Sequence, residues 1–323
     1  MSIASPTAAP GERLDVGVDL SVAVGELVLR NPVMPASGCF GPEVGPLLGP
    51  SLPGALVTKT VFARERAGNR APRLAETAFG MLNSVGIPSP GSARFIDEIL
   101  PGYLMFGIPV VISIGGLFID EYFTIADDLA AQEVAAFEVN VSCPNLEHGG
   151  LAIGTSPEHV FQVVSGVRER LKAPISVKLT PTVSSIGEVA QAAQEAGADA
   201  LVVANSFSGL AIDIFSRRSA LGNGAGGYTG PAIKPLALKL VHDAASAVSI
   251  PVIGCGGIAT AEDVVEFVIA GAAAVQVGTA TFTRPTTMSD IVSELPSVCA
   301  RLGTDSLASL RGTLEDSKFT EVD

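Results

Sequence analysis

Tryptophan is absent from this 323-residue sequence, and aromatic residues make up only 5% of it, so a hydrophobic core has to be built from aliphatic side chains. Positive charge is also scarce, because 20 Lys and Arg residues are outnumbered by 33 Asp and Glu residues. The resulting net charge of −13 argues against binding to nucleic acid or to an anionic membrane surface, both of which attract basic proteins.

Long hydrophobic runs are missing as well. No apolar stretch reaches the roughly 18 residues that a membrane helix needs. The first residues, MSIASPTAAPGERLD, lack the basic and apolar segments of a secretion signal. We therefore expect a cytoplasmic protein that does not bind a membrane.

Cysteine is rare, and Cys39, Cys143, Cys255 and Cys299 lie far apart without forming a Cys-x-x-Cys pair. Zinc ribbons and iron–sulfur clusters need closely spaced thiolates, so we expect no metal site in this chain. So few cysteines in so long a chain also argue against a disulfide framework.

Hydrophobic residues are abundant at 47%, together with 35 Gly and 22 Pro. This composition excludes wholesale disorder and predicts a large core joined by many tight turns. Residues 1–12, rich in Ala, Pro and Ser, are expected to form a flexible arm, and residues 13–323 a single domain. Residues 18–30 are predicted to form a short hairpin.

From residue 32 onward, short β-branched runs alternate with longer Ala-rich amphipathic stretches, a pattern typical of βα units in a parallel sheet. Eight segments are predicted to be strands: Pro32–Ala36, Ala55–Thr60, Ile108–Ile114, Phe137–Val141, Ile175–Leu179, Ala200–Ala204, Pro251–Gly254 and Ala274–Gly278. Helices are expected over 121–134, 157–171, 184–196, 232–248, 260–270 and 287–302. Eight such strands close a barrel, so we predict an α/β fold of the (β/α)8, or TIM barrel, type.

Two intervals, 61–107 and 207–230, show no clean helical pattern and are rich in Gly, Pro, Arg and Asn. Both follow the C-terminal ends of predicted strands, where barrel enzymes place their active sites. Because long loops inside a compact domain are usually functional, we expect these two to cover the C-terminal face.

Two predicted strands contain a lysine, Lys59 in LVTKT and Lys178 in ISVKL. A lysine inside a strand is costly unless it reaches out to solvent or meets an anionic group. Both lie near the C-terminal ends of their strands. We therefore interpret them as cations that face an anionic ligand at the mouth of the barrel.

Glycine-rich turns follow the last two predicted strands, at Gly256-Gly257 and at Gly278-Thr279. Glycine lets backbone N–H groups approach a phosphate closely, and a following helix N-terminus adds positive potential. TIM barrels frequently bind phosphate with the loops after strands seven and eight. A single turn of this kind commonly just ends a strand, but two in consecutive units favour a phosphate site.

Cys143 lies in the polar loop NVSCPNLEHGG, directly after a predicted strand and near Asn140 and Asn145. A lone cysteine is more often a small buried hydrophobic residue, and we interpret the other three cysteines in that way. The polar neighbours make Cys143 a candidate base or nucleophile. His148 is open both to an acid–base role and to a structural role in the loop.

Several longer motifs follow one another in a fixed order, among them NPVMPASGCFG, GNRAPRLAET, GMLNSVGIPSPG, EVNVSCPNLEHGG, SVKLTP, GGYTGPAIKP, PVIGCGGIATAEDV and VQVGTATF. On these motifs the chain, from about Leu20 to Thr283, resembles the class 1 dihydroorotate dehydrogenases, and most closely the class 1B catalytic subunit. The resemblance implies a (β/α)8 barrel with FMN at its C-terminal face. It also implies oxidation of dihydroorotate to orotate in de novo pyrimidine (UMP) biosynthesis.

The resemblance also implies roles for individual positions. Cys143 would be the base that removes the C5 proton of dihydroorotate, and Lys178 would stabilise the negative charge that develops as hydride passes from C6 to FMN. The substrate would be bound by Lys59, Asn83, Ser84, Val85, Gly86, Ile87, Asn140, Asn145, Asn205 and Ser206. FMN would be bound by Ser37, Lys59, Thr60, Ser113, Asn140, Lys178, Ala204, Gly230, Gly256, Gly257, Gly278 and Thr279.

The class within the family bears on the electron acceptor. The cysteine at position 143 differs from the serine that the class 2 enzymes have there, and the HGG that follows SCPN resembles class 1B rather than class 1A. Class 1B enzymes pair with an electron-transfer subunit that carries FAD and a [2Fe–2S] cluster and reduces NAD+. The resemblance therefore implies such a partner, with a homodimer of this chain inside a heterotetramer.

Two positions depart from the family pattern: Ser113 stands where the family usually has Asn, and Ser206 where it usually has Thr. Ser113 and the segment ANSFSGL after the sixth strand resemble the corresponding parts of the dihydropyrimidine dehydrogenases. Oxidation of dihydrouracil or dihydrothymine is therefore an alternative. A barrel that binds a phosphorylated ligand without turnover is a further alternative.

Overall fold

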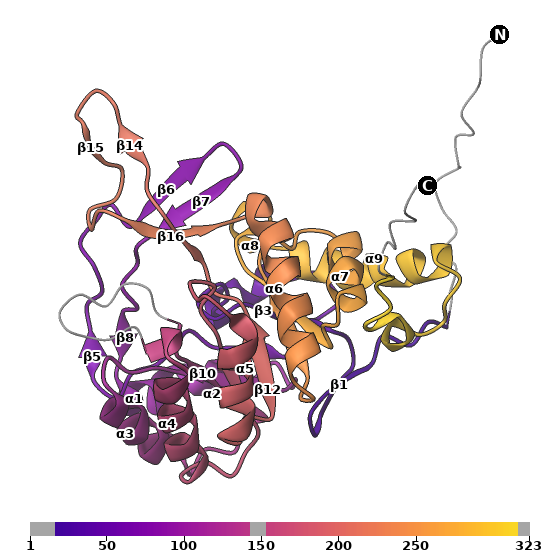
Figure 1. Ribbon diagram of the computed structural model, residues 1–323, viewed down its shortest axis with the longest axis horizontal. Coiled ribbons are helices and arrows are strands. Elements are labelled where there is room, and N and C mark those ends of the chain that lie inside the picture. Colours follow the sequence, from indigo (N-terminus) through magenta and orange to yellow (C-terminus); the bar gives the residue numbers. More distant parts are fainter. Residues whose placement is uncertain (1–16, 143–152, 316–323) are drawn as a thin grey trace, which may run out of the picture.

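The computed structural model describes residues 17–142 and 153–315, so the expected arm at 1–12 lies outside the described residues. An eight-stranded parallel sheet forms the centre of the molecule (Figure 1). Its strands overlap the eight predicted segments: β3 (Val33–Pro35), β4 (Leu56–Val57), β9 (Val110–Ile114), β10 (Ala136–Asn140), β11 (Ile175–Lys178), β12 (Ala200–Val203), β17 (Val252–Cys255) and β18 (Ala274–Val277). Their order in the sheet is β3-β18-β17-β12-β11-β10-β9-β4.

The two end strands of this order, β3 and β4, come together and nearly close the sheet into a barrel. The N–H of Gly54, just before β4, donates to the Val33 carbonyl oxygen at 2.8 Å. A Cβ at position 54 would lie only 2.1 Å from the carbonyl oxygen of Asn31, so the approach of the two strands depends on glycine there. The predicted (β/α)8 barrel is confirmed.

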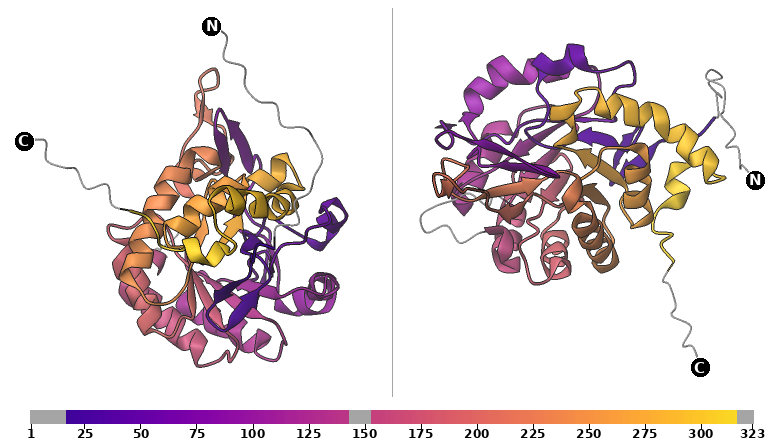
Figure 2. Two further views of the ribbon diagram at one scale, coloured as in Figure 1. Left: turned by 90° about the vertical axis from the view of Figure 1, so that its right-hand side faces the viewer. Right: turned by 90° about the horizontal axis from the view of Figure 1, so that it is seen from above.

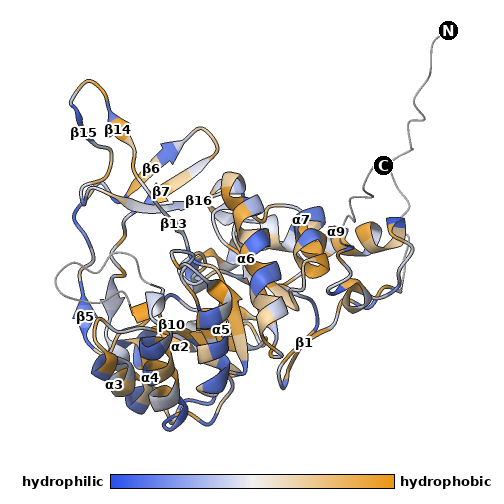
Figure 3. Ribbon diagram, in the orientation of Figure 1, coloured by the Kyte–Doolittle hydropathy of each residue, from blue (hydrophilic) through white to orange (hydrophobic). Residues whose placement is uncertain are grey.

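Helices form the outer layer around the barrel (Figure 2). The six predicted helices are present as α3 (Ile119–Leu129), α4 (Pro157–Arg168), α5 (Ile186–Glu195), α6 (Lys234–Ala247), α7 (Ala261–Ile269) and α9 (Thr287–Arg301). Hydrophilic and hydrophobic residues alternate along them (Figure 3), and α4 buries Val160, Val163, Val164 and Val167 on one face. Within the described ranges, no helix combines the length and apolarity that crossing a bilayer would require.

The interval 61–107 contains helix that the sequence pattern did not predict. A continuous helical stretch is made of α1 (Ser92–Arg94), the π-helical turn η2 (Phe95–Ile99) and α2 (Leu100–Leu104). It joins β4 to β9 and so completes the second βα unit of the barrel. Pro101 and Gly102 interrupt the helical pattern in the sequence, but burial of Phe95, Leu100 and Tyr103 stabilises the helix through tertiary packing.

The predicted N-terminal hairpin is also confirmed, as β1 (Val22–Val24) and β2 (Leu27–Leu29), which pair antiparallel. Its apolar side chains Val24 and Leu29 belong to the same buried cluster as Met34, Val57 and Val111 of the barrel strands. The hairpin therefore closes the barrel on the side where the strands begin. This leaves the opposite end open for a ligand.

The two long loops pair with each other above the C-terminal ends of the strands. β13 (Phe207–Gly209) and β16 (Gly226–Thr229) come from the second loop, and β6 (Leu74–Thr77) and β7 (Gly80–Asn83) from the first. They form one antiparallel sheet, in the order β13-β16-β7-β6, which lies on the far side of the barrel from β1 (Figure 1). Two-stranded pairs, β5 (Glu65–Arg66) with β8 (Ser89–Pro90) and β14 (Ile212–Asp213) with β15 (Arg218–Ser219), flank it.

We predict that Gly54→Ala destabilises the protein by about 1–3 kcal/mol, because the new Cβ would overlap the Asn31 carbonyl at the barrel closure. Urea unfolding measures the change. Gly17→Ala is the matched control, since a Cβ there meets no atom within 4 Å and stability should not change. Equal stability of the two variants would contradict the closure argument.

Candidate active site

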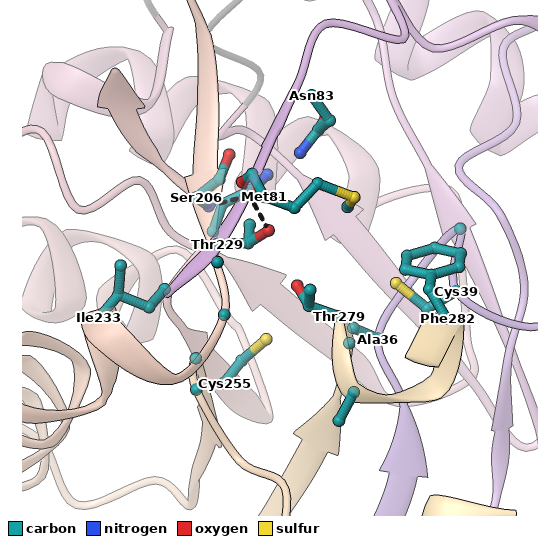
Figure 4. A pocket seen from close by; sticks show the side chains of 18 of the residues that line it. Ala36, Cys39, Met81, Asn83, Ser206, Thr229, Ile233, Cys255, Thr279 and Phe282 are labelled. Atoms are coloured by element: carbon teal, nitrogen blue, oxygen red, sulfur yellow. Dashed lines mark hydrogen bonds between the residues drawn. The ribbon is translucent and has the colours of Figure 1, made fainter. Parts of the chain in front are cut away.

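A cavity of about 780 Å³ lies between the C-terminal ends of the barrel strands and the sheet formed by the two long loops (Figure 4). Its floor comes from residues at or just after the C-terminal ends of strands β3, β4, β10, β11, β12, β17 and β18, and its roof from β6, β7 and β16. The Thr229 hydroxyl of β16 donates to the Met81 carbonyl of β7 at 3.2 Å, which ties the two roof strands together. A volume of this order suits a ligand of cofactor size.

Most of the residues that the sequence assigned to a site meet at this cavity. Those that line it are Ser37, Lys59, Thr60, Asn83, Val85, Gly86, Ile87, Asn140, Lys178, Ala204, Asn205, Ser206, Gly230, Gly256, Gly257, Gly278 and Thr279. They come from both long loops and from seven different βα junctions. Cys143 and Asn145, together with His148, lie outside the described residues.

Two assigned residues, Ser84 and Ser113, are fully buried and are not among the lining residues. The Ser84 hydroxyl accepts a hydrogen bond from the Asn69 side-chain amide at 2.9 Å, and Asn69 does not line the cavity either. The Ser113 hydroxyl lies 3.0 Å from the Thr60 hydroxyl and donates to Glu138 at 3.0 Å. Ser113 therefore lies one side chain behind the cavity wall.

Lys178 is 3% exposed, so its ammonium does not reach solvent around the outside of the barrel. Its Nζ donates to Gln276 Oε1 at 2.9 Å, and Gln276 Nε2 in turn donates to Glu138 Oε2 at 2.6 Å. Burial alone would lower the pKa of Lys178, but the Cys255 thiolate, when ionised, and the Glu138 carboxylate raise it above its ordinary value. Lys178 is therefore a cation at the cavity wall near pH 7.

Two thiols, Cys39 and Cys255, also line the cavity. Figure 4 shows them on different elements, with Thr279 between the two loops that carry them. Burial raises the pKa of Cys39 to about 12 and also raises the pKa of Cys255, against the opposing effect of the Lys178 charge. Both are therefore neutral near pH 7, and Glu138 remains the anion that balances Lys178.

Lys59 differs from Lys178 because its side chain is exposed toward the cavity. Partial burial lowers the pKa of its ammonium, and the nearby Arg73 guanidinium lowers it further. Arg73 itself donates to the Asn69 carbonyl at 2.5 Å. Lys59 thus brings positive charge to the cavity, with Arg73 near it, in a protein whose net charge is −13.

A chain of amide and hydroxyl groups crosses the floor of the cavity. Asn140 Nδ2 donates to the Thr60 hydroxyl at 3.1 Å, and Asn140 Oδ1 accepts from the Ser142 hydroxyl at 2.6 Å. Asn205 Nδ2 donates to the Ser142 hydroxyl at 2.7 Å. Since each hydrogen bond fixes the orientation of a side chain, the amides of Asn140 and Asn205 are held in one arrangement.

The segment 83–87 (the strip 83–87) forms another part of the cavity wall, and contacts with β16 and with Asn69 hold it in place. Asn83 Nδ2 donates to the Gly227 carbonyl at 3.2 Å, across the β7–β16 pair. Gly86 and Ile87 adopt positive φ angles of 74° and 44°, and a Cβ at Gly86 would lie 2.5 Å from Asn69 atoms. Close packing of the 69 loop against this strip therefore requires glycine at position 86.

Glycine turns line another side of the cavity. Gly230, Gly256 and Gly257 have φ angles of 109°, 137° and 78°, which residues with a side chain rarely adopt. A Cβ at Gly257 would lie 2.7 Å from the Lys234 Cβ, so the turn packs tightly against the start of α6. Glycine turns of this kind, beside a cavity large enough for an isoalloxazine ring, are compatible with FMN.

A family model described as "Dihydroorotate dehydrogenase" matches residues 19–299. The chain belongs to the dihydroorotate dehydrogenase family. It is 42% identical to the "Dihydroorotate dehydrogenase B (NAD(+)), catalytic subunit" of Bacillus pumilus, over 91% of this chain and 96% of that protein. Proteins of the same name from Shouchella clausii and Geobacillus sp. are 43% and 42% identical over 91% of this chain, and over 97% and 95% of their own lengths.

These relatives agree with the class 1B resemblance of the motifs. The site of this chain also contains residues that sequence reasoning missed. Glu138, Gln276 and Ser142 are buried and form hydrogen bonds to the assigned residues Ser113, Lys178 and Asn205, respectively. The first two carried a usable signal, because a charged or amide side chain inside an apolar strand is costly to bury without a partner, as it is for the lysine of ISVKL. Ser142 is a single polar loop residue, which gave no such signal.

We predict that Gly257→Ala lowers the affinity of the apoprotein for FMN by about tenfold, or about 1.4 kcal/mol, because the new Cβ would displace the turn from Lys234. Titration of apoprotein with FMN, followed by flavin fluorescence, gives the affinity. Gly312→Ala is the control: its φ of 68° is also positive, but a Cβ there meets nothing within 4 Å and the cavity is not involved. An unchanged affinity in Gly257→Ala would contradict the phosphate assignment.

Proposed function

We propose that this protein oxidises dihydroorotate to orotate in pyrimidine biosynthesis, with FMN as its cofactor. The observation that carries the proposal is the Lys178 ammonium, which is buried at the wall of a cofactor-sized cavity and balanced by Glu138. Membership of the dihydroorotate dehydrogenase family supplies the reaction.

The residues around the cavity match the two halves of this cofactor. Gly256, Gly257 and Gly278 would hold the phosphate, and Thr60 and Lys178 the polar edge of the ring system. When bound, FMN accepts the hydride that leaves C6 of the substrate. Lys178, with its charge maintained in a buried setting, would stabilise the negative charge that results.

The substrate would lie against the amide groups of the cavity. The free N–H groups of Asn140 and Asn205, together with Asn83, are suited to the carbonyl oxygens of a dihydropyrimidine. Lys59 is exposed toward the same space and would pair with the carboxylate of dihydroorotate. That carboxylate is absent from dihydrouracil and dihydrothymine, so Lys59 favours dihydroorotate over these alternatives.

Ser113, the departure on which the dihydropyrimidine alternative depends, does not contribute to the lining of the cavity. Its hydroxyl bonds to Thr60 and Glu138 instead. A residue in this place acts on the ligand through Thr60 rather than by contact. The substitution therefore gives no support to a different substrate.

Cys143 would take the C5 proton onto its thiolate. The residue just before it, Ser142, is held by hydrogen bonds to Asn140 and Asn205, which line the cavity. A thiol has an ordinary pKa of about 8.5, close enough to neutrality to serve as a general base.

The proposed electron acceptor is NAD+, reached through a separate subunit. Support comes from the relatives, whose names describe the catalytic subunit of an NAD(+) enzyme. We propose an FAD/[2Fe–2S] subunit as this partner and a homodimer of the present chain in the core of a heterotetramer.

The test of the function is anaerobic reduction of the protein-bound flavin by a panel of dihydropyrimidines. We expect bleaching of the flavin absorbance with dihydroorotate and not with dihydrouracil or dihydrothymine, because the latter two lack the carboxylate for Lys59. Bleaching by dihydrouracil alone would establish the alternative substrate class. Absence of bleaching with all three compounds would indicate a protein that binds its ligand without turnover.

We predict that Cys143→Ala slows flavin reduction by dihydroorotate by about 10²–10⁴-fold, the usual contribution of a general base. Stopped-flow absorbance measures the rate at saturating dihydroorotate. Cys299→Ala is the control, since Cys299 is buried in the core on α9, apart from the cavity lining, and should keep the wild-type rate. A wild-type rate in Cys143→Ala would refute the base assignment.

A further inference from the structure

Glu138 is a carboxylate with 0% exposure inside the barrel, and it is not among the residues that line the cavity. Burying a charge costs several kcal/mol unless it is paired and hydrogen-bonded. In the register of the sheet, Glu138 lies opposite Ser113 of β9, and Asn140, two residues on, lies opposite Lys178 of β11. Glu138 therefore occupies the layer directly beneath the cavity floor.

Both carboxylate oxygens of Glu138 accept hydrogen bonds. Oε2 accepts from Gln276 Nε2 at 2.6 Å, and Oε1 accepts from the Ser113 hydroxyl at 3.0 Å. Because a carboxylate can only accept, each partner must point a proton at it. Two branches of the hydrogen-bond network therefore begin at this one side chain.

The first branch orients the groups around Lys178. With its NH2 turned toward Glu138, the Gln276 amide presents its oxygen to Lys178 Nζ, 2.9 Å away. The reversed amide would place donor against donor. An ammonium has three protons, so two remain for a ligand in the cavity.

The second branch runs through the cavity floor. The single proton of Ser113 goes to Glu138, so in the 3.0 Å contact with Ser113 the Thr60 hydroxyl must donate. Thr60 therefore accepts from Asn140 Nδ2, which turns the Asn140 oxygen toward Ser142.

The same logic continues from Ser142 to Asn205. The Ser142 hydroxyl donates to Asn140 and so accepts from Asn205 Nδ2, while Asn205 Oδ1 accepts from the Ser206 N–H at 2.7 Å. The amide oxygens of Asn140 and Asn205 are thus used inside the protein. Each amide nitrogen uses one of its two N–H groups in the network, so a second N–H remains on both side chains for the cavity.

We propose that Glu138 is a positioning residue that sets the direction of every hydrogen bond in this network, so that the floor offers donors to the ligand. These donors are the ammonium of Lys178 and the amide N–H groups of Asn140 and Asn205. The recognised ligand edge is therefore one of acceptors, as in the carbonyl-rich edges of a pyrimidinedione or a flavin. The inference rests on the proposed function for the identity of these ligands.

The test exchanges the amide and the carboxylate between positions 138 and 276. In Glu138→Gln, the new amide can donate to the Gln276 oxygen, and Gln276 then turns its own NH2 toward Lys178. If the new amide donates to Ser113 instead, the Ser113 hydroxyl donates to Thr60. The Thr60 proton then has no acceptor. In the double variant Glu138→Gln/Gln276→Glu, the amide at 138 accepts from Ser113 and donates to the carboxylate at 276, which accepts from Lys178. Every bond is then satisfied.

The readouts are the affinity of the apoprotein for FMN and the affinity of the FMN-loaded protein for orotate, followed by the shift in flavin absorbance. We expect Glu138→Gln to weaken both by about ten- to hundredfold, the cost of a buried donor without an acceptor. The double variant should return to within about threefold of wild type. A merely structural role would not give this recovery, because the double variant carries more changes than the single one.

Glu133→Gln serves as the control, since Glu133 is exposed near the start of the same strand and should change neither affinity. Wild-type affinities in Glu138→Gln, or a double variant no better than the single one, would overturn the proposal. If Glu138→Gln does not fold, the double variant alone decides, and its failure to fold would also overturn the proposal. FMN affinity is measured without dihydroorotate, so a protein that fails the substrate test can still pass this one.

Discussion

The positive charge of Lys178 inside the barrel is the constraint that the surrounding structure satisfies. An ammonium that is 3% exposed needs a compensating anion, and the two neighbouring thiols are neutral near pH 7 because burial raises their pKa. Glu138 supplies the anion through Gln276. A largely aliphatic barrel therefore contains a polar layer just below its open end. This layer orients the polar groups that line the cavity.

The opposite ends of the barrel have opposite character for a simple reason. The N-terminal hairpin fills one end with apolar side chains such as Val24 and Leu29. The two long loops cover the other end with an antiparallel sheet, and a cavity of about 780 Å³ lies between this sheet and the ends of the barrel strands. Because roof and floor come from segments far apart in the sequence, the cavity forms only when the whole barrel has closed.

Much of the fold could be predicted because it follows from local patterns. Each of the eight strands carries its own run of apolar residues, and helix α4 shows its buried valines at helical spacing. The helical stretch from Ser92 to Leu104 was missed since Pro101 and Gly102 hide its periodicity. The pairing of β7 with β16 was missed because it joins Asn83 to Gly227, which no local pattern relates.

For the site, the sequence by itself determined which residue types stand at the ends of the strands: lysines, amides and glycine turns that a parallel barrel must bring to one face. Only the tertiary structure decided which of them meet the cavity. Ser113 points behind Thr60, and Ser84 bonds to Asn69. It also decided the partnership of Lys178 with Gln276 and Glu138, from three different strands. The physical reason is that the hydrophobic pattern of a buried strand is local in the sequence, whereas hydrogen bonds across a barrel depend on its closure and register.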